Sequence, residues 1–264
     1  MSNISNLAYV HPDAKLGKNV IVEAFAYVDA NTEIGDGTRI MPQATVLSGS
    51  RIGKNCTIFP SAVVGADPQD LKFKGEETLA IVGDNVTVRE CCTINKGTAS
   101  RGYTKVGNNC LLMAYSHVAH DCVLSDYIIV GNATQLAGEV EIDDYAILSG
   151  GALVHQFTKI GMHVMVQGGS KVSKDIPPYI MAGREPLAYA GINIVGLRRR
   201  GFASEQVNII QDVYRYLYQT GYNITQALER IENELPESVE RSIIVDFVRS
   251  SSRGIVRGMM DGVS

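Results

Sequence analysis

The stretch VGNNCLLMAYSHVAHDCVLSDYIIVGNATQLAGEVEI, residues 106–142, decides the fold because an aliphatic residue returns at every sixth position. The pattern runs on to Lys174, and its anchors are Val106, Leu112, Val118, Leu124, Val130, Leu136, Ile142, Leu148, Val154, Ile160, Val166 and Val172. A period of six matches neither the two of a strand nor the 3.6 of a helix, so it indicates a supersecondary unit repeated along one axis. The sequence therefore predicts a solenoid.

The fourth residue after each anchor is usually small or β-branched, as at Cys110, Ser116 and Cys122. One bulky and one small inward residue in every six suit a short strand followed by a corner. Three such sides close a triangular coil of about eighteen residues, as in hexapeptide β-helices. The same register already starts at Val10. We therefore predict an all-β solenoid in which each coil buries its aliphatic residues against its neighbours.

Two polar interruptions lie near residues 65–81 and 98–105. The anchors on either side, Val64 and Val82, then Ile94 and Val106, remain separated by multiples of six. Phase alone leaves open whether these segments are distorted coils or extruded loops. The charged residues of the first segment favour a loop, because they could not all face inward.

The hexads end at Asp175-Ile-Pro-Pro-Tyr179, where two prolines should stop a ladder. Helical periodicity follows from about Asn193, with a helix capped by Ser204, a second near 225–235 and a third from Pro236 to Arg249. We predict a β-helix over residues 1–180 and a C-terminal helical domain over 181–264 that covers the open end of the solenoid.

Composition narrows the class of protein. The 264 residues are 45% hydrophobic and 7% aromatic, which suits a narrow aliphatic core. No apolar run is long enough to span a membrane, and no export signal is evident, so we expect a soluble, cytoplasmic protein. The five cysteines include no CxxC pair, which favours a reducing compartment. A net charge of −4 argues against general nucleic-acid binding.

Residues eighteen apart should stack in a column, about 4.8 Å per coil. This register places Gly138 one coil from His120, and Gln156 one coil further, with His155 beside it. A histidine next to Asp121 can act as a general base, and a glycine amide can stabilise an oxyanion. The column therefore predicts attack of a substrate hydroxyl or amine on a thioester. His11 and His163 are interpreted as ordinary surface or corner residues.

Several motifs resemble one family closely: the bacterial acyl-carrier-protein:UDP-N-acetylglucosamine O-acyltransferases, within the hexapeptide-repeat acyltransferase superfamily. The resemblance rests on segments spread over the whole chain, namely QDLKFKGE (69–76), HVAHDC (117–122), NATQLAG (132–138), VHQF (154–157), HVMV (163–166), DIPPY (175–179) and GLRRRGF (196–202). It implies a left-handed parallel β-helix that forms a homotrimer with active sites between subunits. It implies neither a metal nor an organic cofactor.

The implied reaction moves a 3-hydroxyacyl group from acyl carrier protein to the glucosamine 3-hydroxyl of UDP-N-acetylglucosamine, the first step of lipid A biosynthesis. By motif, His120 is the base, Asp121 its partner and Gly138 the oxyanion donor. The resemblance assigns substrate contacts to Asp70, Lys72, His117, His155, Gln156, Asn193, Arg199 and Arg200. It assigns acyl-chain length to Gly168, where a glycine leaves room for a long chain. Lys171, Lys174 and Arg198 are the expected docking residues for the acidic carrier protein.

The chain departs from the family's pattern at Asn95, Glu139 and Val195, positions that bear on nucleotide contacts and on the polarity of the acyl groove. The run Arg198–Arg200 also has a simpler interpretation, as compensation of a helix C-terminus rather than phosphate binding.

Four alternatives remain open. A zinc carbonic anhydrase uses three histidines on such a solenoid, but Gly138 rather than a histidine stacks on His120. The later N-acyltransferase of the same pathway typically carries an extra N-terminal domain. A coenzyme A-dependent acetyltransferase is disfavoured by the long helical cap, and a purely structural solenoid leaves the histidine column unexplained.

Overall fold

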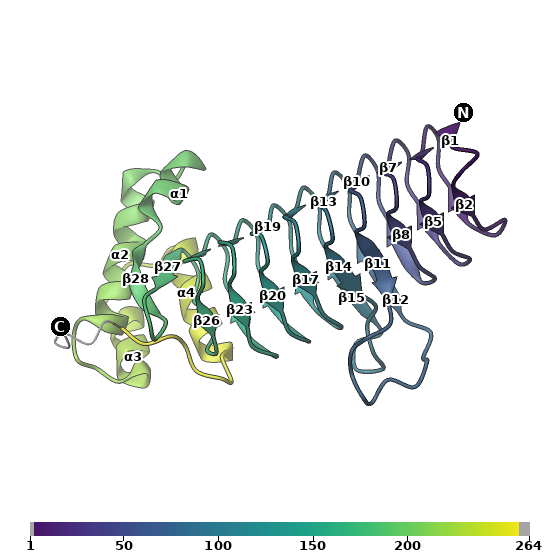
Figure 1. Ribbon diagram of the computed structural model, residues 1–264. Coiled ribbons are helices and arrows are strands. Elements are labelled where there is room, and N and C mark those ends of the chain that lie inside the picture. Colours follow the sequence, from purple (N-terminus) through teal and green to yellow (C-terminus); the bar gives the residue numbers. More distant parts are fainter. Residues whose placement is uncertain (1–2, 259–264) are drawn as a thin grey trace.

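The computed structural model describes residues 3–258 and shows a three-sided parallel β-helix with helices gathered at its C-terminal end (Figure 1). Within these residues the strands form sheets of eleven, nine and eight members. Strands of one sheet succeed each other every third element, so each turn of the chain adds one short strand to every sheet. The predicted solenoid is confirmed.

The eleven-stranded sheet contains β1 (Asn3–Ile4), β4 (Ile21–Val22), β7 (Arg39–Ile40), β10 (Thr57–Ile58), β13 (Thr87–Val88), β16 (Leu111–Leu112), β19 (Ile129–Val130), β22 (Ile147–Leu148), β25 (Met165–Val166), β27 (Ile180–Gly183) and β28 (Ala188–Ile192). The nine-stranded sheet contains β2 (Tyr9–Val10), β5 (Tyr27–Val28), β8 (Thr45–Val46), β11 (Val63–Ala66), β14 (Thr93–Asn95), β17 (His117–Val118), β20 (Gln135–Leu136), β23 (Leu153–Val154) and β26 (Lys171–Val172). The eight-stranded sheet contains β3 (Lys15–Leu16), β6 (Glu33–Ile34), β9 (Ser50–Ile52), β12 (Leu79–Val82), β15 (Tyr103–Val106), β18 (Val123–Leu124), β21 (Glu141–Ile142) and β24 (Lys159–Ile160).

The hexad anchors fill the interior. Leu112, Val130 and Leu148 are fully buried and follow one another in register on neighbouring strands of one sheet. The second inward position takes small residues because it lies at a corner, where less room remains. Cys56, Cys92, Cys110 and Cys122 occupy this position and are buried, as predicted. Burial raises the pKa of the Cys122 thiol to about 12, so this cysteine is a core residue and not a nucleophile.

Both interruptions are loops that leave the β-helix and return to it. Residues 67–78 connect β11 to β12, and residues 96–102 connect β14 to β15. Val82 pairs with Ile52 and Val106 pairs with Val82, so these two coils contain 30 and 24 residues where an ordinary coil contains 18. The second loop is shorter than expected, because Tyr103–Val106 already forms a strand that pairs with β12.

The sheet continues past the prolines. After Pro177 and Pro178 the strand β27 pairs in parallel with β25, and β28 then turns back antiparallel to β27. Residues 180–192 are therefore a β-hairpin in a region expected to be helical. A ladder can resume here because the prolines lie before the strand rather than within it.

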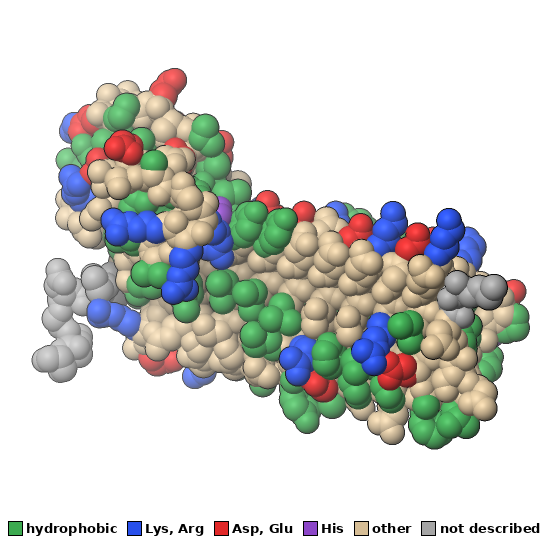
Figure 2. Space-filling view, turned by 90° about the horizontal axis from the view of Figure 1, so that it is seen from above, with side chains coloured by type: hydrophobic (Ala, Val, Ile, Leu, Met, Phe, Trp, Pro, Cys, Tyr) green, Lys and Arg blue, Asp and Glu red, His purple; other side chains and the backbone are tan. Residues whose placement is uncertain are grey.

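Four helices follow, namely α1 (Ile194–Arg199), α2 (Ser204–Tyr218), α3 (Ile224–Glu234) and α4 (Val239–Ser250). Two expected starts were wrong. Ala203 is the N-cap of α2, and its amide donates to the Gln206 side chain at 2.9 Å. Ser238 caps α4 through Arg241 N–H, so Pro236 lies outside that helix. In Figure 2, Lys and Arg side chains gather near the junction of the helical part with the β-helix.

Candidate active site

His120 and Asp121 lie at the corner that follows β17. Asp121 has a φ of 59°, in the left-handed region. In an extended strand the side chains of two successive residues point to opposite faces, whereas this turn lets the side chains of His120 and Asp121 meet. His120 Nδ1 lies 2.8 Å from Asp121 Oδ2, and both residues are buried. A carboxylate only accepts hydrogen bonds, so the proton of the neutral imidazole is assigned to Nδ1 and Nε2 remains free to accept one.

Gly138 lies directly against the imidazole. A Cβ at this position would stand 2.5 Å from His120 Nε2, and the Glu139 amide donates to His120 O at 2.9 Å. Within residues 3–258 the Gly138 N–H donates to no protein acceptor. The predicted column is thus present as geometry, with a free amide one coil from the ring. Such a pair places a proton acceptor and an oxyanion donor within reach of one reacting group.

The next coil continues the column. Phe157 N–H donates to Gly138 O at 3.1 Å, which puts the half-buried Gln156 one coil beyond the glycine. His155 is exposed, and its Nδ1 lies 3.0 Å from Gln156 O and 3.2 Å from Arg253 Nη2. These two partners demand different protonation of Nδ1, since the carbonyl needs a donor and the guanidinium an acceptor.

His117 faces the same side of the sheet as His155. Its Nδ1 lies 2.7 Å from Thr93 Oγ1 on the neighbouring strand β14. Burial, and then the nearby His120, lower the pKa of His117, so this ring is neutral at pH 7. A neutral imidazole can give or take a hydrogen bond without repelling a second histidine.

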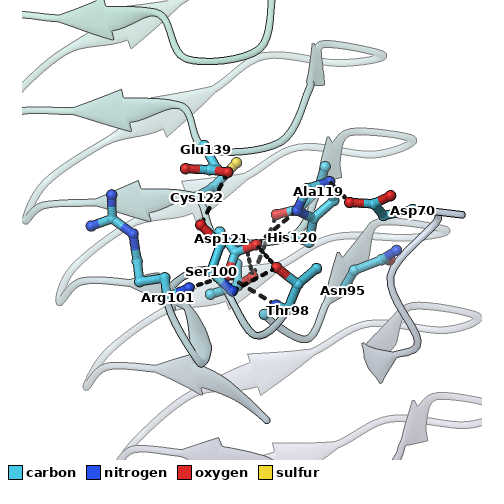
Figure 3. A network of polar contacts seen from close by, with 12 residues as sticks. Asp70, Asn95, Thr98, Ser100, Arg101, Ala119, His120, Asp121, Cys122 and Glu139 are labelled. Carbon is cyan, nitrogen blue, oxygen red and sulfur yellow. Dashed lines mark hydrogen bonds and ion pairs between the residues drawn. The ribbon is translucent and has the colours of Figure 1, made fainter. Parts of the chain in front are cut away.

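The first loop brings a second carboxylate to His120. Asp70 Oδ2 lies 4.0 Å from His120 Nε2, and Figure 3 shows the Asp70 side chain directed toward the ring. Asn95 and Lys96 secure this loop: Asn95 Nδ2 donates to Asp67 O at 2.9 Å, and Lys96 Nζ lies 2.8 Å from the Asp67 carboxylate. Lys72 follows Asp70 and is exposed.

The predicted residues of the helical region lie elsewhere. Asn193 is buried, caps α1 through Gly196 N–H and donates to His163 O at 2.9 Å. Arg200 donates to Tyr145 O at 3.2 Å and stacks over the Tyr145 ring. Tyr145 and His163 stand at the corner between the eight- and eleven-stranded sheets, whereas His120 stands at the corner between the nine- and eight-stranded sheets. One chain therefore does not bring the two groups together.

The structure places the three residues that depart from the family's pattern: two of them contact the inserted loops and the third is exposed. Asn95 is buried and supports the first loop. Glu139 Oε1 accepts from Ser100 Oγ at 3.3 Å, which links the coil after His120 to the second loop. Val195 is exposed on α1, as are Arg198 and Arg199. The basic last turn of α1 agrees with the simpler interpretation of the arginine run.

Two hollows flank the nine-stranded sheet near its C-terminal end. A groove of 360 Å³ runs along β17, β20, β23 and β26, from His117 and Ala119 to Lys171. A larger cavity of 790 Å³ lies between β26, the hairpin and residues 256–258. Its charged lining residues are Lys171, Lys174, Arg184, Glu185 and Arg257. Lys171 lines both hollows, whereas Arg198 lines neither, and Gly168 is exposed at the corner before β26.

Sequence reasoning missed four contributors. Thr93 supports His117, Arg253 reaches His155, and Arg184 and Arg257 enlarge the basic cavity. Thr93 lies 24 residues before His117, which is the length of that coil, so a correct estimate of the second loop would have revealed it. Arg253 comes from the chain after α4, which periodicity does not place.

No group of three or more His, Cys, Asp or Glu side chains that could hold a metal occurs among residues 3–258. In the same range, no helix combines the length and apolar character needed to cross a membrane.

Known proteins with similar sequences and structures include acyltransferases. Residues 175–256 match the family model described as UDP N-acetylglucosamine O-acyltransferase, domain 2, and residues 4–102 match the GMPPB C-terminal domain. An acyl-[acyl-carrier-protein]–UDP-N-acetylglucosamine O-acyltransferase of Ectopseudomonas mendocina is 44% identical over 97% of this chain and 100% of its own.

Solved structures agree. A UDP-N-acetylglucosamine acyltransferase from Bacteroides fragilis is 58% identical, with a TM-score of 0.94 over 96% of this chain and 99% of its own. The enzyme from Francisella novicida is 41% identical, with a TM-score of 0.93 over 96% and 94% of the two chains. The fold is the left-handed parallel β-helix that the resemblance implied. Likeness over nearly the whole length shows that the chain belongs to the family of acyl-[acyl-carrier-protein]–UDP-N-acetylglucosamine O-acyltransferases, and it is an acyltransferase.

Proposed function

We propose that the protein transfers a 3-hydroxyacyl group from acyl carrier protein to the glucosamine 3-hydroxyl of UDP-N-acetylglucosamine, with His120 as general base. One observation carries the chemistry: the ring of a buried His–Asp pair lies against Gly138, whose amide has no protein acceptor among the described residues. The relatives named above supply the substrates of the proposal. The cysteines of the described structure are free, which supports a reducing compartment, and we place the reaction in the cytoplasm.

The steps follow from the positions of the groups. His120 Nε2 takes the proton of the sugar hydroxyl while the hydroxyl oxygen attacks the carbonyl carbon of the thioester. The negative charge that forms on the carbonyl oxygen is stabilised by Gly138 N–H, a contribution of about 10²–10³ in rate. The tetrahedral intermediate then expels the thiolate of the carrier protein, and the imidazolium of His120 gives this thiolate the proton that came from the sugar hydroxyl. Asp121 holds Nδ1–H throughout and stabilises the imidazolium.

The remaining site residues fit a site shared between subunits. Asp70, Lys72, His117, His155 and Gln156 lie around or beyond His120 in the same chain. Asn193, Arg199 and Arg200 lie by another corner and would reach a substrate only from a neighbouring copy. We infer a homotrimer in which the helical region of one subunit approaches the His120 corner of the next.

The hollows suggest where the donor lies. The groove beside His117 is lined mainly by apolar groups and suits an acyl chain or its linker, and the cavity that shares Lys171 with it carries an excess of basic side chains. We infer that Lys171 and Lys174, with Arg184 and Arg257, attract the acidic carrier protein, and that exposed Arg198 adds to this field. Gly168 has no side chain, and we expect a long acyl group.

The experiment offers 3-hydroxyacyl carrier proteins of several chain lengths with UDP-N-acetylglucosamine, and separately with its 3-amino analogue. His120→Ala should lower kcat about a hundredfold or more, while His11→Ala, on the first coils, serves as the matched control. Absence of product from the hydroxyl acceptor at every chain length would reject the substrate assignment. Wild-type turnover with an undiminished His120→Ala variant would keep the family and reject the base. A preference for short chains alone would reject the inference from Gly168.

A further inference from the structure

The second loop places donors on the carboxylate that orients the base. Asp121 Oδ2 accepts from Thr98 Oγ1 at 2.7 Å and faces His120 Nδ1 at 2.8 Å, and Oδ1 accepts from Thr98 N–H at 2.9 Å. Figure 3 shows Thr98 next to Asp121 in this network. We propose that Thr98 is a positioning residue: it fixes the Asp121 carboxylate, and its hydroxyl and His120 share the negative charge of that carboxylate. The proposal rests on the function proposed above and assigns a role to a residue outside the His–Asp pair.

Burial makes these donors necessary. Asp121 is fully buried, and an ionised carboxylate at such a site is costly unless its lone pairs are satisfied. Arg101 N–H adds a longer contact to Oδ1 at 3.3 Å, so each oxygen faces two donors. Thr98 alone supplies two of the four.

The loop itself is held in place, so Thr98 cannot easily turn away. Gly102 N–H donates to Thr98 O at 2.7 Å, and Gly97 N–H donates to Leu79 O at 3.1 Å. The Arg101 side chain forms an ion pair with Glu141 at 2.7 Å. These contacts hold the inserted segment in one conformation. The position of Thr98 therefore determines the position of the Asp121 carboxylate, which in turn orients the ring of His120.

Sharing of Oδ2 has a chemical consequence. The Thr98 hydroxyl and the imidazole draw on the same oxygen, so the hydroxyl limits how strongly Asp121 holds a protonated His120. A base that must later return its proton to a thiolate benefits from this limit. Without the hydroxyl, His120 should keep its proton to a higher pH, and Asp121 should lose the restraint on its rotation.

Other charged or titratable groups also face the pair. These are Asp70 from the first loop, His117 on the same strand, Cys122 on the next residue, and Arg101 and Glu139 around the second loop. The Thr98 hydroxyl also accepts from Ser100 N–H at 3.2 Å. A serine at position 98 can keep this contact as well as the one to Asp121, so the comparison of valine with serine reports the hydroxyl as a whole.

The test compares Thr98→Val, which keeps the shape and the backbone donor but removes the hydroxyl, with Thr98→Ser, which keeps both donors. Thr38→Val is the matched control, because Thr38 is a buried threonine whose hydroxyl donates to Gly53 O at 2.8 Å in the N-terminal coils. We measure kcat, KM and their pH dependence in the whole protein. We also follow the pH titration of the His120 ring by NMR with ¹⁵N-labelled histidine, which needs no substrate.

Thr98→Val should lower kcat about tenfold with little change in KM for the sugar nucleotide, a scale usual for lost support of a catalytic group. Its acid limb and the His120 titration should both move to higher pH by about half a unit or more. Thr98→Ser should keep kcat, the acid limb and the His120 titration at their wild-type values. Thr38→Val should change stability without moving the acid limb or the titration. A Thr98→Val variant with wild-type kcat and an unmoved titration would overturn the proposal, as would a serine variant as impaired as the valine one. Failure of wild-type protein to transfer an acyl group would reject the proposed function, and the titration would still test Thr98.

Discussion

His163 should make stability fall as the pH drops, and the effect can be worked out from its surroundings. The ring stacks between Tyr145 and Tyr179, at centroid distances of 4.9 and 5.7 Å, with Phe202 against its edge at 5.1 Å. It is 7% exposed, and its Nδ1 has no partner among the described residues. Burial, and then the positive charge of Arg200, lower the pKa of His163 to about 4.

The sign follows from proton binding. Between the unfolded pKa of about 6.5 and the folded value of about 4, the unfolded chain holds a proton that the folded chain does not. The free energy of unfolding therefore falls as the pH is lowered through this window, by about 3 kcal/mol in all, and changes no further below it. Above pH 6.5 both states are neutral at this ring, and the contribution is fully present.

His163→Phe tests this reasoning. The corner residue has a φ of 56°, and Phe157 and Tyr145 occupy corners of the same kind at 65° and 60°, so an aromatic ring is tolerated there. Denaturant unfolding followed by circular dichroism, at one protein concentration, gives the stability of both proteins at pH 7 and pH 4. Wild type should lose about 3 kcal/mol more than the variant over this interval. Equal losses in the two proteins would refute the buried neutral histidine.

Two further predictions concern the reaction. Gly138→Ala places a methyl group 2.5 Å from His120 Nε2, so kcat should fall about a hundredfold or more while circular dichroism still shows the β-helix; a fully active alanine variant would contradict the placement of the base. Prolonged treatment with EDTA should leave acyl transfer unchanged, because the proposed chemistry uses only protein groups; a loss of activity restored by zinc would favour the metal-dependent alternative.

Periodicity predicted what depends on stacking. The eighteen-residue column put Gly138 on His120 without knowledge of any contact, because in a β-helix sequence separation fixes position along the axis. The aliphatic anchors and the inward cysteines were predicted for the same reason.

What lies outside the repeat could not be derived this way. Thr98 comes from an inserted loop, and its contact with Asp121 depends on the path of seven residues that have no period. Arg253 approaches His155 only because the chain after α4 returns to the last coil, where Ile255 pairs with Asp175. The hairpin after Pro178 does not follow from the repeat, because two prolines predict the end of a ladder, although here they only precede a strand.

The two loops add twelve and six residues to coils that otherwise contain eighteen, so each insertion equals a whole number of sides. Both loops leave the β-helix and return to it, so the coils beyond each loop keep their alignment. This makes the β-helix a modular support: a segment that carries Asp70 or Thr98 can change in length without moving His120 relative to Gly138. Changes in the loops at the corners can therefore alter which substrate is accepted while His120 and Gly138 keep their relative positions.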